Sequence, residues 1–214
     1  MNKIYFIPGL ATDQRLFIRQ QQAGFALEVL TWIQPEQNES IETYAYRMAE
    51  RIQEKAPILA GVSFGGIMAI EIAKHIKDGR VILISSVKTK TEIPFYFKLA
   101  RFLGAGKLPT WFYSQAGLWA KLIRPMFGKM NSEEKQLFFS MIKDADPYLV
   151  KWSVQKVLNW NNTHTSDKLS HIHGSSDLIF PIQKISDPIS ISGGGHFMIL
   201  QKSNEVNEAL QKLA

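Results

Sequence analysis

The chain has 214 residues, 45% of them hydrophobic and 11% aromatic, which is enough for one domain with a sizeable core. This composition excludes a disordered protein, and the absence of cysteine excludes disulfides, thiolate chemistry and cysteine-ligated metals. The first residues lack the apolar run of a signal peptide, and no stretch reaches the roughly 18 apolar residues of a membrane span. We therefore expect a soluble, cytoplasmic protein without stable membrane insertion.

The net charge of +6 is concentrated in one part of the chain. Residues 94–160 contain ten Lys or Arg and four Asp or Glu, which accounts for the whole excess. The basic residues there are spaced out rather than clustered, so we expect no nucleic-acid partner. A solvated helical face is the simplest explanation, and attraction to acidic substrates or to a membrane surface is the alternative. The residues concerned are Lys98, Arg101, Lys107, Lys121, Arg124 and Lys129.

The first part of the chain alternates strands and helices. Residue patterns predict strands at 3–7, 27–32, 57–62 and 80–85. Helices are predicted to open at Thr12 as N-cap, at Ser40 with an end near Lys55, and at Phe64 with an end near Ile76. The fourth strand is apolar throughout, which is typical of a parallel sheet covered on both faces. The alternation predicts a doubly wound, mostly parallel α/β sheet.

Residues 94–160 break this alternation. The segment is helical in pattern, holds 14 of the 24 aromatic residues, and has helix starts at Asn131 and at Asp146-Pro147. Strands return at 168–173 and 188–192, and a helix is predicted at 204–213, so the sheet has about six strands. We interpret 94–160 as a helical lid inserted into a single domain of residues 1–214. Most of its aromatic residues should form core, and a few would face the site if the segment is a lid.

The stretch Gly61-x-Ser63-x-Gly65 lies between a predicted strand and a predicted helix. This context is the one that a nucleophilic serine at a tight strand-to-helix turn requires. A serine hydroxyl is a weak nucleophile, so it needs a base and a third group that orients the base. Loops that follow two later strands supply candidates at the same edge of the sheet. These are Asp177 and His196, and the chain order is then Ser63, Asp177, His196.

Four stretches of the chain together resemble the α/β-hydrolase superfamily, and the resemblance runs from Lys3 to the last helix. They are Ile7-Pro8-Gly9-Leu10, Gly61-Val62-Ser63-Phe64-Gly65-Gly66, His173-Gly174-Ser175-Ser176-Asp177 and Gly194-Gly195-His196-Phe197. The resemblance implies a compact serine hydrolase in which Ser63 is the nucleophile, His196 the base and then acid, and Asp177 the orienting carboxylate. It further implies an oxyanion hole made by the backbone N–H groups of Leu10 and Phe64.

Two departures from the family pattern matter. Pro8 stands where many relatives have histidine, which changes the floor of the pocket. The chain begins at what would be the family's third strand, so the usual first hairpin is missing from the expected sheet. The exposed edge strand that results is a candidate surface for a homodimer.

Other residues compete for some of these roles. Asp144, Asp146 and Asp167 are rival carboxylates, but none directly follows a predicted strand. The alternation His171-Ile172-His173 places two histidines on one face of a strand, as metal ligands require. The spacing to Asp177 is wrong for metal-dependent hydrolases, and so we expect no metal site and no cofactor.

Three functions remain open at this point. The favoured one is hydrolysis of a small or medium apolar carboxylic ester or thioester through an acyl-enzyme, with a small molecule as the partner. The second is C–C bond hydrolysis or a lyase reaction with the same three residues. The third is a non-catalytic ligand-binding protein, which we expect to have lost part of the triad.

Overall fold

The computed structural model describes residues 3–214, and within them six strands form one parallel sheet in the order β2-β1-β3-β4-β5-β6. This arrangement confirms the predicted doubly wound α/β sheet. β2 and β6 are the two edges of the sheet. The strands are β1 (Ile4–Ile7), β2 (Leu27–Val29), β3 (Ile58–Val62), β4 (Arg80–Ile84), β5 (Leu169–Gly174) and β6 (Ile189–Ile191).

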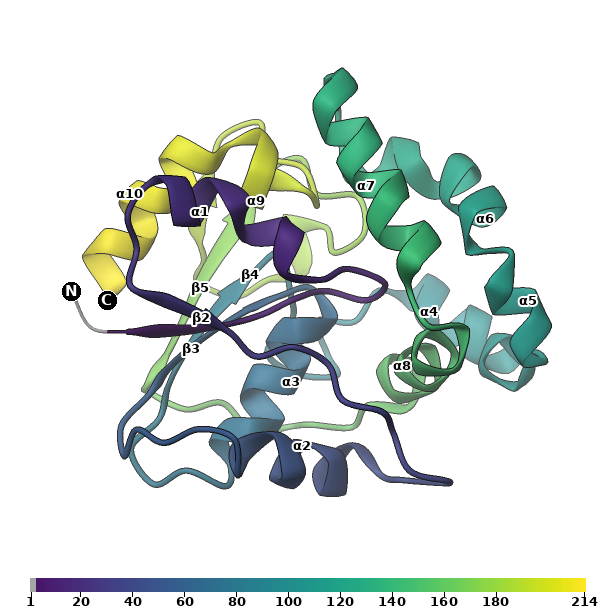
Figure 1. Ribbon diagram of the computed structural model, residues 1–214, viewed down its shortest axis with the longest axis horizontal. Helices are drawn as coiled ribbons and strands as arrows, with labels where there is room; N and C mark the ends of the chain where they lie inside the picture. The colour runs from purple at the N-terminus through teal and green to yellow at the C-terminus, as the bar shows by residue number, and fades with distance from the viewer. Residues whose placement is uncertain (1–2) are drawn as a thin grey trace.

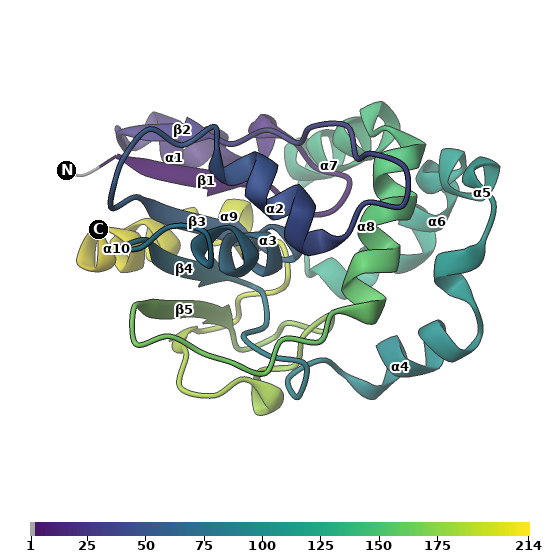
Figure 2. The ribbon, with the colours of Figure 1, turned by 90° about the horizontal axis from the view of Figure 1, so that it is seen from below.

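Helices cover both faces of this sheet, as Figures 1 and 2 show. One layer contains α1 (Ile18–Gln22), α9 (Met198–Gln201) and α10 (Ser203–Leu213), and the opposite layer contains α2 (Ile41–Ala49) and α3 (Phe64–Ala73). Side chains of a strand alternate between the two layers because the period of a strand is two residues. In β1, Ile4 and Phe6 therefore join one buried cluster, and Tyr5 and Ile7 join the other.

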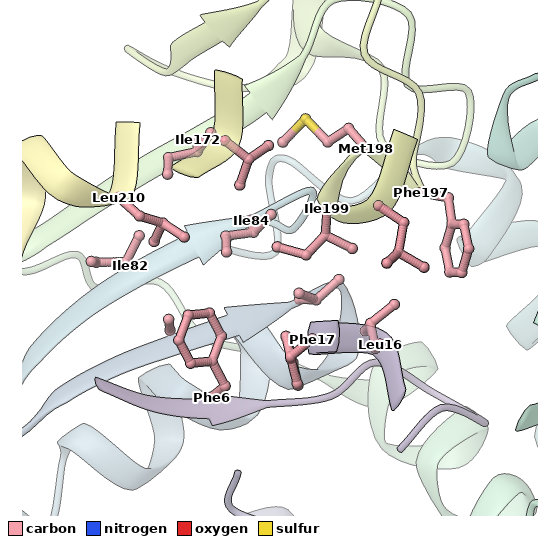
Figure 3. Packing of buried hydrophobic residues seen from close by; sticks show 14 of the residues in the cluster. Phe6, Leu16, Phe17, Ile82, Ile84, Ile172, Phe197, Met198, Ile199 and Leu210 are labelled. Carbon is pink, nitrogen blue, oxygen red and sulfur yellow. The ribbon is translucent and has the colours of Figure 1, made fainter. Parts of the chain in front are cut away.

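The cluster on the side of α1, α9 and α10 is drawn in Figure 3. Phe6 packs there on Phe17, with their ring centroids 4.8 Å apart, and Met198 and Leu210 close the cluster from the C-terminal helices. Burial of apolar surface of this kind contributes about 25 cal/mol per Å². The cluster therefore fixes the last helices, and with them the loop that carries His196, against the sheet.

Between β4 and β5 the chain leaves the sheet and forms a group of helices, which we call the cap segment (residues 94–160). Figure 2 shows the segment beyond the ends toward which the strand arrows point. Its helices are α4 (Phe95–Phe102), α5 (Thr110–Ser114), α6 (Ala116–Ile123), α7 (Ser132–Asp144) and α8 (Pro147–Asn159). Asn131 begins α7 with a capping box, and Asp146 caps α8 with Pro147 in its first turn, as predicted.

Polar contacts tie the cap segment to both layers of the core. The indole N–H of Trp152 donates to the Glu39 carbonyl at 3.1 Å, and that of Trp160 donates to Glu71 Oε1 at 2.7 Å. On the other side of the sheet, Arg15 pairs with Asp144 of α7 at 2.8 Å. Within residues 3–214, no helix combines the length and the hydropathy that crossing a membrane requires.

The prediction that Thr12 is the N-cap of the first helix is wrong. Its hydroxyl donates to the Gly9 carbonyl at 2.9 Å, and Asp13 instead caps a short 3-10 helix, Gln14–Phe17, by accepting from the Arg15 N–H. Thr12 is therefore used to close the turn after β1, and the cap lies one residue later.

Two predicted helices are longer than the observed ones. α2 ends at Ala49 because the last N–H groups bond three residues back, Arg51 to Met48 and Ile52 to Ala49. α3 ends at Ala73 in the same way, with the N–H of Ile76 bonded to the Ala73 carbonyl. Such i to i−3 bonds tighten a helix end into a 3-10 turn. β2 is also shorter than predicted and stops at Val29.

Candidate active site

Ser63 occupies the sharp turn between β3 and α3. Its backbone has φ 54° and ψ −120°, a conformation that residues with a side chain rarely adopt. The flanking glycines permit this turn, because a Cβ on Gly61 would collide with the backbone of Gly65. A Cβ on Gly65 would in turn collide with the carbonyls of Ile7 and Pro8. The glycine spacing around Ser63 is therefore a steric requirement of the turn.

Hydrogen bonds hold this strained turn in place. The Ser63 N–H donates to the Ile84 carbonyl at 3.0 Å, and the Ser63 carbonyl accepts from the Gly66 N–H at 2.9 Å. The hydroxyl of Ser86 also donates to that carbonyl, at 2.7 Å. Sequence reasoning missed Ser86, although its place just after β4, next to the strand that carries Ser63, is a signal that could have found it.

His196 lies opposite Ser63, in the loop between β6 and α9. Its Nε2 is 2.9 Å from Ser63 Oγ, and the imidazole is buried. The loop is fixed from the cap segment, because the N–H of Phe197 donates to the Phe127 carbonyl at 3.3 Å. Gly195 packs closely on Gly128, because a Cβ added to Gly195 would lie 3.0 Å from the Gly128 Cα. The cap segment therefore helps to set the position of the imidazole.

Asp177 completes the arrangement from the loop after β5. Its Oδ2 is 2.8 Å from His196 Nδ1, and its Oδ1 accepts from the N–H groups of Ile179 at 2.8 Å and Phe180 at 2.9 Å. Burial raises the pKa of Asp177, but the charge of His196 and the hydrogen bonds outweigh burial, so the pKa lies below its ordinary value. The ionised carboxylate thus faces the imidazole, and the neutral tautomer that satisfies both contacts carries its proton on Nδ1.

The rival carboxylates lie elsewhere. Asp144 pairs with Arg15, Asp146 caps α8, and Asp167 lies 3.4 Å from the Ser166 hydroxyl. Each is engaged away from His196 and Ser63. Asp177 is therefore the carboxylate that the fold brings to the imidazole.

His171 and His173 are both buried side by side on β5. His173 Nε2 is 2.7 Å from the Phe180 carbonyl, and its Nδ1 is 3.1 Å from His171 Nε2. Burial lowers the pKa of both imidazoles, so they are neutral near pH 7. Among residues 3–214, no group of three or more His, Cys, Asp or Glu side chains could hold a metal ion. His173 therefore holds the loop behind Asp177, a role that sequence reasoning missed.

The backbone N–H groups of Leu10 and Phe64 were expected to form the oxyanion hole. Within residues 3–214, neither the Leu10 N–H nor the Phe64 N–H donates a hydrogen bond to another protein group. Gly9 lies against Ser63, since a Cβ at Gly9 would be 3.5 Å from the Ser63 Cβ. Phe64 begins α3, so its N–H also lies at the positive end of that helix.

Aromatic side chains surround the imidazole. The ring of Phe127, from the cap segment, meets the ring of His196 edge-on with centroids 5.4 Å apart, and Phe180 lies 5.6 Å away on another side. Phe97 of α4 stacks on Phe180 at 5.4 Å. Among the aromatic residues of the cap segment, Phe127 thus contacts His196 directly, Phe97 reaches it through Phe180, and Trp152 meets the ring of Phe64 edge-on at 6.2 Å. Two aromatic rings therefore contact His196 beside its polar contacts with Asp177 and Ser63.

No family model matches the sequence, and no curated protein matches it at the sequence level. Solved structures do match the fold. A bromoperoxidase from Bacillus anthracis has a TM-score of 0.69 and 18% identity, over 99% of this chain and 91% of that one. An N-acyl homoserine lactonase, AidH, has a TM-score of 0.71 and 13% identity, over 99% and 87%. The meta-cleavage product hydrolase CumD from Pseudomonas fluorescens has a TM-score of 0.67 and 14% identity, over 100% and 90%. The chain therefore has the α/β-hydrolase fold.

Proposed function

We propose that the protein is a serine hydrolase of small or medium apolar carboxylic esters or thioesters, with Ser63, His196 and Asp177 as its catalytic triad. The observation that carries the proposal is the pair of contacts at His196, 2.9 Å from Nε2 to Ser63 Oγ and 2.8 Å from Nδ1 to Asp177 Oδ2. A base within hydrogen-bond reach of the nucleophile, itself oriented by a buried carboxylate, is the arrangement that activates a serine.

The reaction follows from these contacts. Ser63 Oγ attacks the carbonyl carbon of the substrate, and its proton passes to His196 Nε2. The resulting oxyanion accepts hydrogen bonds from the N–H groups of Leu10 and Phe64. His196 then gives the proton to the leaving alcohol or thiol, which departs from the acyl-enzyme. Water attacks the acyl-enzyme in a second round of the same steps, and the acid is released with Ser63 restored.

The surroundings of the triad support an apolar acyl or alcohol group. Phe127 and Phe180 flank the imidazole, and Trp32 stacks on Phe64 with ring centroids 5.5 Å apart. Pockets that bind small apolar molecules are lined in this way. One protein of similar fold is a lactonase and another is a meta-cleavage product hydrolase, so the test includes C–C bond hydrolysis beside ester hydrolysis. Covering of the β2 edge by a second copy of the chain stays a prediction.

The test is a product analysis on acyl esters and thioesters of increasing length, beside a diketone that a C–C hydrolase would cleave. We expect turnover of the esters or thioesters by the wild type, and loss of that turnover in S63A by roughly 10⁴-fold or more. Cleavage of the diketone alone would assign C–C hydrolysis. Full ester turnover by S63A would refute the scheme, and ligand binding without any turnover would favour a binding protein.

A further inference from the structure

Helix α6 buries small residues and exposes large apolar ones, which is the opposite of a typical surface helix. Its small residues face the protein: Ala120 is buried, and Ala116 packs against the core cluster. Its large residues face outward, and Leu118, Trp119 and Leu122 are exposed by 58%, 42% and 70%. A surface helix normally buries its apolar stripe and exposes polar residues. The apolar face of α6 is therefore available to something outside the fold.

The preceding helix extends this face. Trp111 of α5 is 68% exposed, and Phe112 beside it stacks on Trp119 with ring centroids 4.6 Å apart. We call Trp111, Leu118, Trp119, Leu122 and Ile123 the α5–α6 surface. Figure 1 shows both helices at the end of the molecule opposite the two termini. Single exposed apolar residues are common in proteins, whereas a contiguous group of large ones marks an interaction site.

Basic residues predominate in the chain segment that contains the α5–α6 surface, although the neighbouring helix α7 begins with Glu133 and Glu134 in its first turn. Residues 94–131 contain six Lys or Arg and no Asp or Glu. Among the ion pairs of residues 3–214, none includes Lys107, Lys121 or Arg124. Lys121 lies within α6 itself, and Arg124 follows its last residue. The apolar face is thus accompanied by basic side chains whose charge the protein does not neutralise.

The exposed apolar residues and the unpaired basic residues together indicate which partner binds the α5–α6 surface. A second copy of the chain would bring the same positive charge to the contact, which opposes self-association through this face. A bilayer with anionic lipids supplies negative charge for the basic residues and an interfacial region suited to Trp and Leu. We propose that the α5–α6 surface docks the protein on membranes that contain anionic lipids. Docking is peripheral, and it does not depend on Ser63.

The test is cosedimentation of the protein with vesicles of phosphatidylcholine, with and without phosphatidylglycerol. We expect binding that requires phosphatidylglycerol and weakens as the salt concentration rises. The double variant L118S/L122S should lower the partition coefficient by roughly tenfold or more, because it removes two side chains from the buried apolar area. K121Q/R124Q should lower it by roughly tenfold through the lost charges. A matched control is I18S/Y46S, which replaces two exposed apolar residues of α1 and α2 and should bind as the wild type does.

Several results would overturn docking. Docking would be refuted if the protein bound equally to vesicles with and without phosphatidylglycerol. It would also be refuted if L118S/L122S and K121Q/R124Q both bound as the wild type does. A third contradicting result would be a dimeric wild type and a monomeric L118S/L122S variant, neither of which binds vesicles. Loss of ester turnover by L118S/L122S with vesicle binding intact would assign the face to substrate instead. S63A should bind vesicles as the wild type does, so a failure of the proposed catalysis and a failure of docking are distinguishable.

Discussion

The central strands of the α/β core and helices α4 and α6 of the cap segment differ in how far they bury their apolar side chains. Every residue of β1 and β3 is buried, whereas α4 has no buried residue and α6 buries only Ala120. Close packing holds the core in one geometry, which a site that needs atoms within hydrogen-bond reach requires. Within the cap segment, α7 and α8 bury large apolar side chains such as Phe138, Met141 and Trp152, whereas α4 and α6 expose most of theirs. In our proposals, the core carries the catalytic residues, and the exposed helices of the cap segment carry the surface that docks on membranes.

The largest effect is expected from D177N, in the core. The amide would keep an oxygen for the N–H groups of Ile179 and Phe180 but would present its NH₂ to His196 Nδ1. That arrangement favours the wrong imidazole tautomer, so we expect kcat for an ester to fall by about 10⁴-fold. Measurement of kcat and of the thermal unfolding midpoint separates this effect from misfolding. A loss below tenfold in a folded variant would contradict the role of Asp177, and W111F in the cap segment should leave kcat unchanged.

Two glycine substitutions compare how the core and the cap segment tolerate an added methyl group, measured by the free energy of unfolding. G65A would push a Cβ into the carbonyls of Ile7 and Pro8, so we expect the free energy of unfolding to fall by about 3 kcal/mol or the protein not to fold. G117A in α6 meets no atom within 4 Å and should raise that free energy by about 0.5 to 1 kcal/mol. Urea unfolding measures both. Equal effects of the two substitutions would remove the distinction between core and cap segment.

A smaller effect is expected at an anchor of the cap segment. W160F removes the N–H that donates to the buried Glu71 carboxylate, which keeps its ion pair with Lys74. The lost hydrogen bond to a charged group should cost about 1.5 to 3 kcal/mol. W111F changes an exposed indole and should alter the free energy of unfolding by less than about 0.5 kcal/mol. Chemical denaturation of the two variants decides the point. A W160F protein as stable as W111F would show that this anchor contributes nothing.

The smallest effect is a change of stability with pH. The pKa of Asp177 is lower in the folded protein than its ordinary value, so the ionised carboxylate stabilises the fold. This stabilisation is complete above the ordinary aspartate pKa of about 4 and is lost as the pH falls through the folded-state pKa. We expect the stability advantage of the wild type over D177N to shrink below about pH 4. Denaturant titrations across that range measure it, and an advantage that grows with acid would contradict the sign.

Much of the core and of the candidate site could be predicted from local sequence. Gly61, Ser63 and Gly65 stand between a strand and a helix, and such a turn has few steric solutions. Asp177 and His196 could be placed at one sheet edge because each directly follows a strand. Thr12 was misassigned because a hydroxyl can cap a helix or close a turn, and only the neighbouring backbone decides between the two. Which aromatic side chains reach the imidazole depends on tertiary packing, so Phe127 and Phe180 could not be singled out.

Labelling with a fluorophosphonate probe, followed by identification of the modified residue, tests the central claim most directly. The probe reacts with a serine only when a base activates its hydroxyl, so it reports the contact between Ser63 and His196 without any knowledge of the substrate. We predict that the wild type is labelled at Ser63 and that S63A and H196A are not labelled. Folded wild type that stays unlabelled, or a label that persists in H196A, would contradict the account.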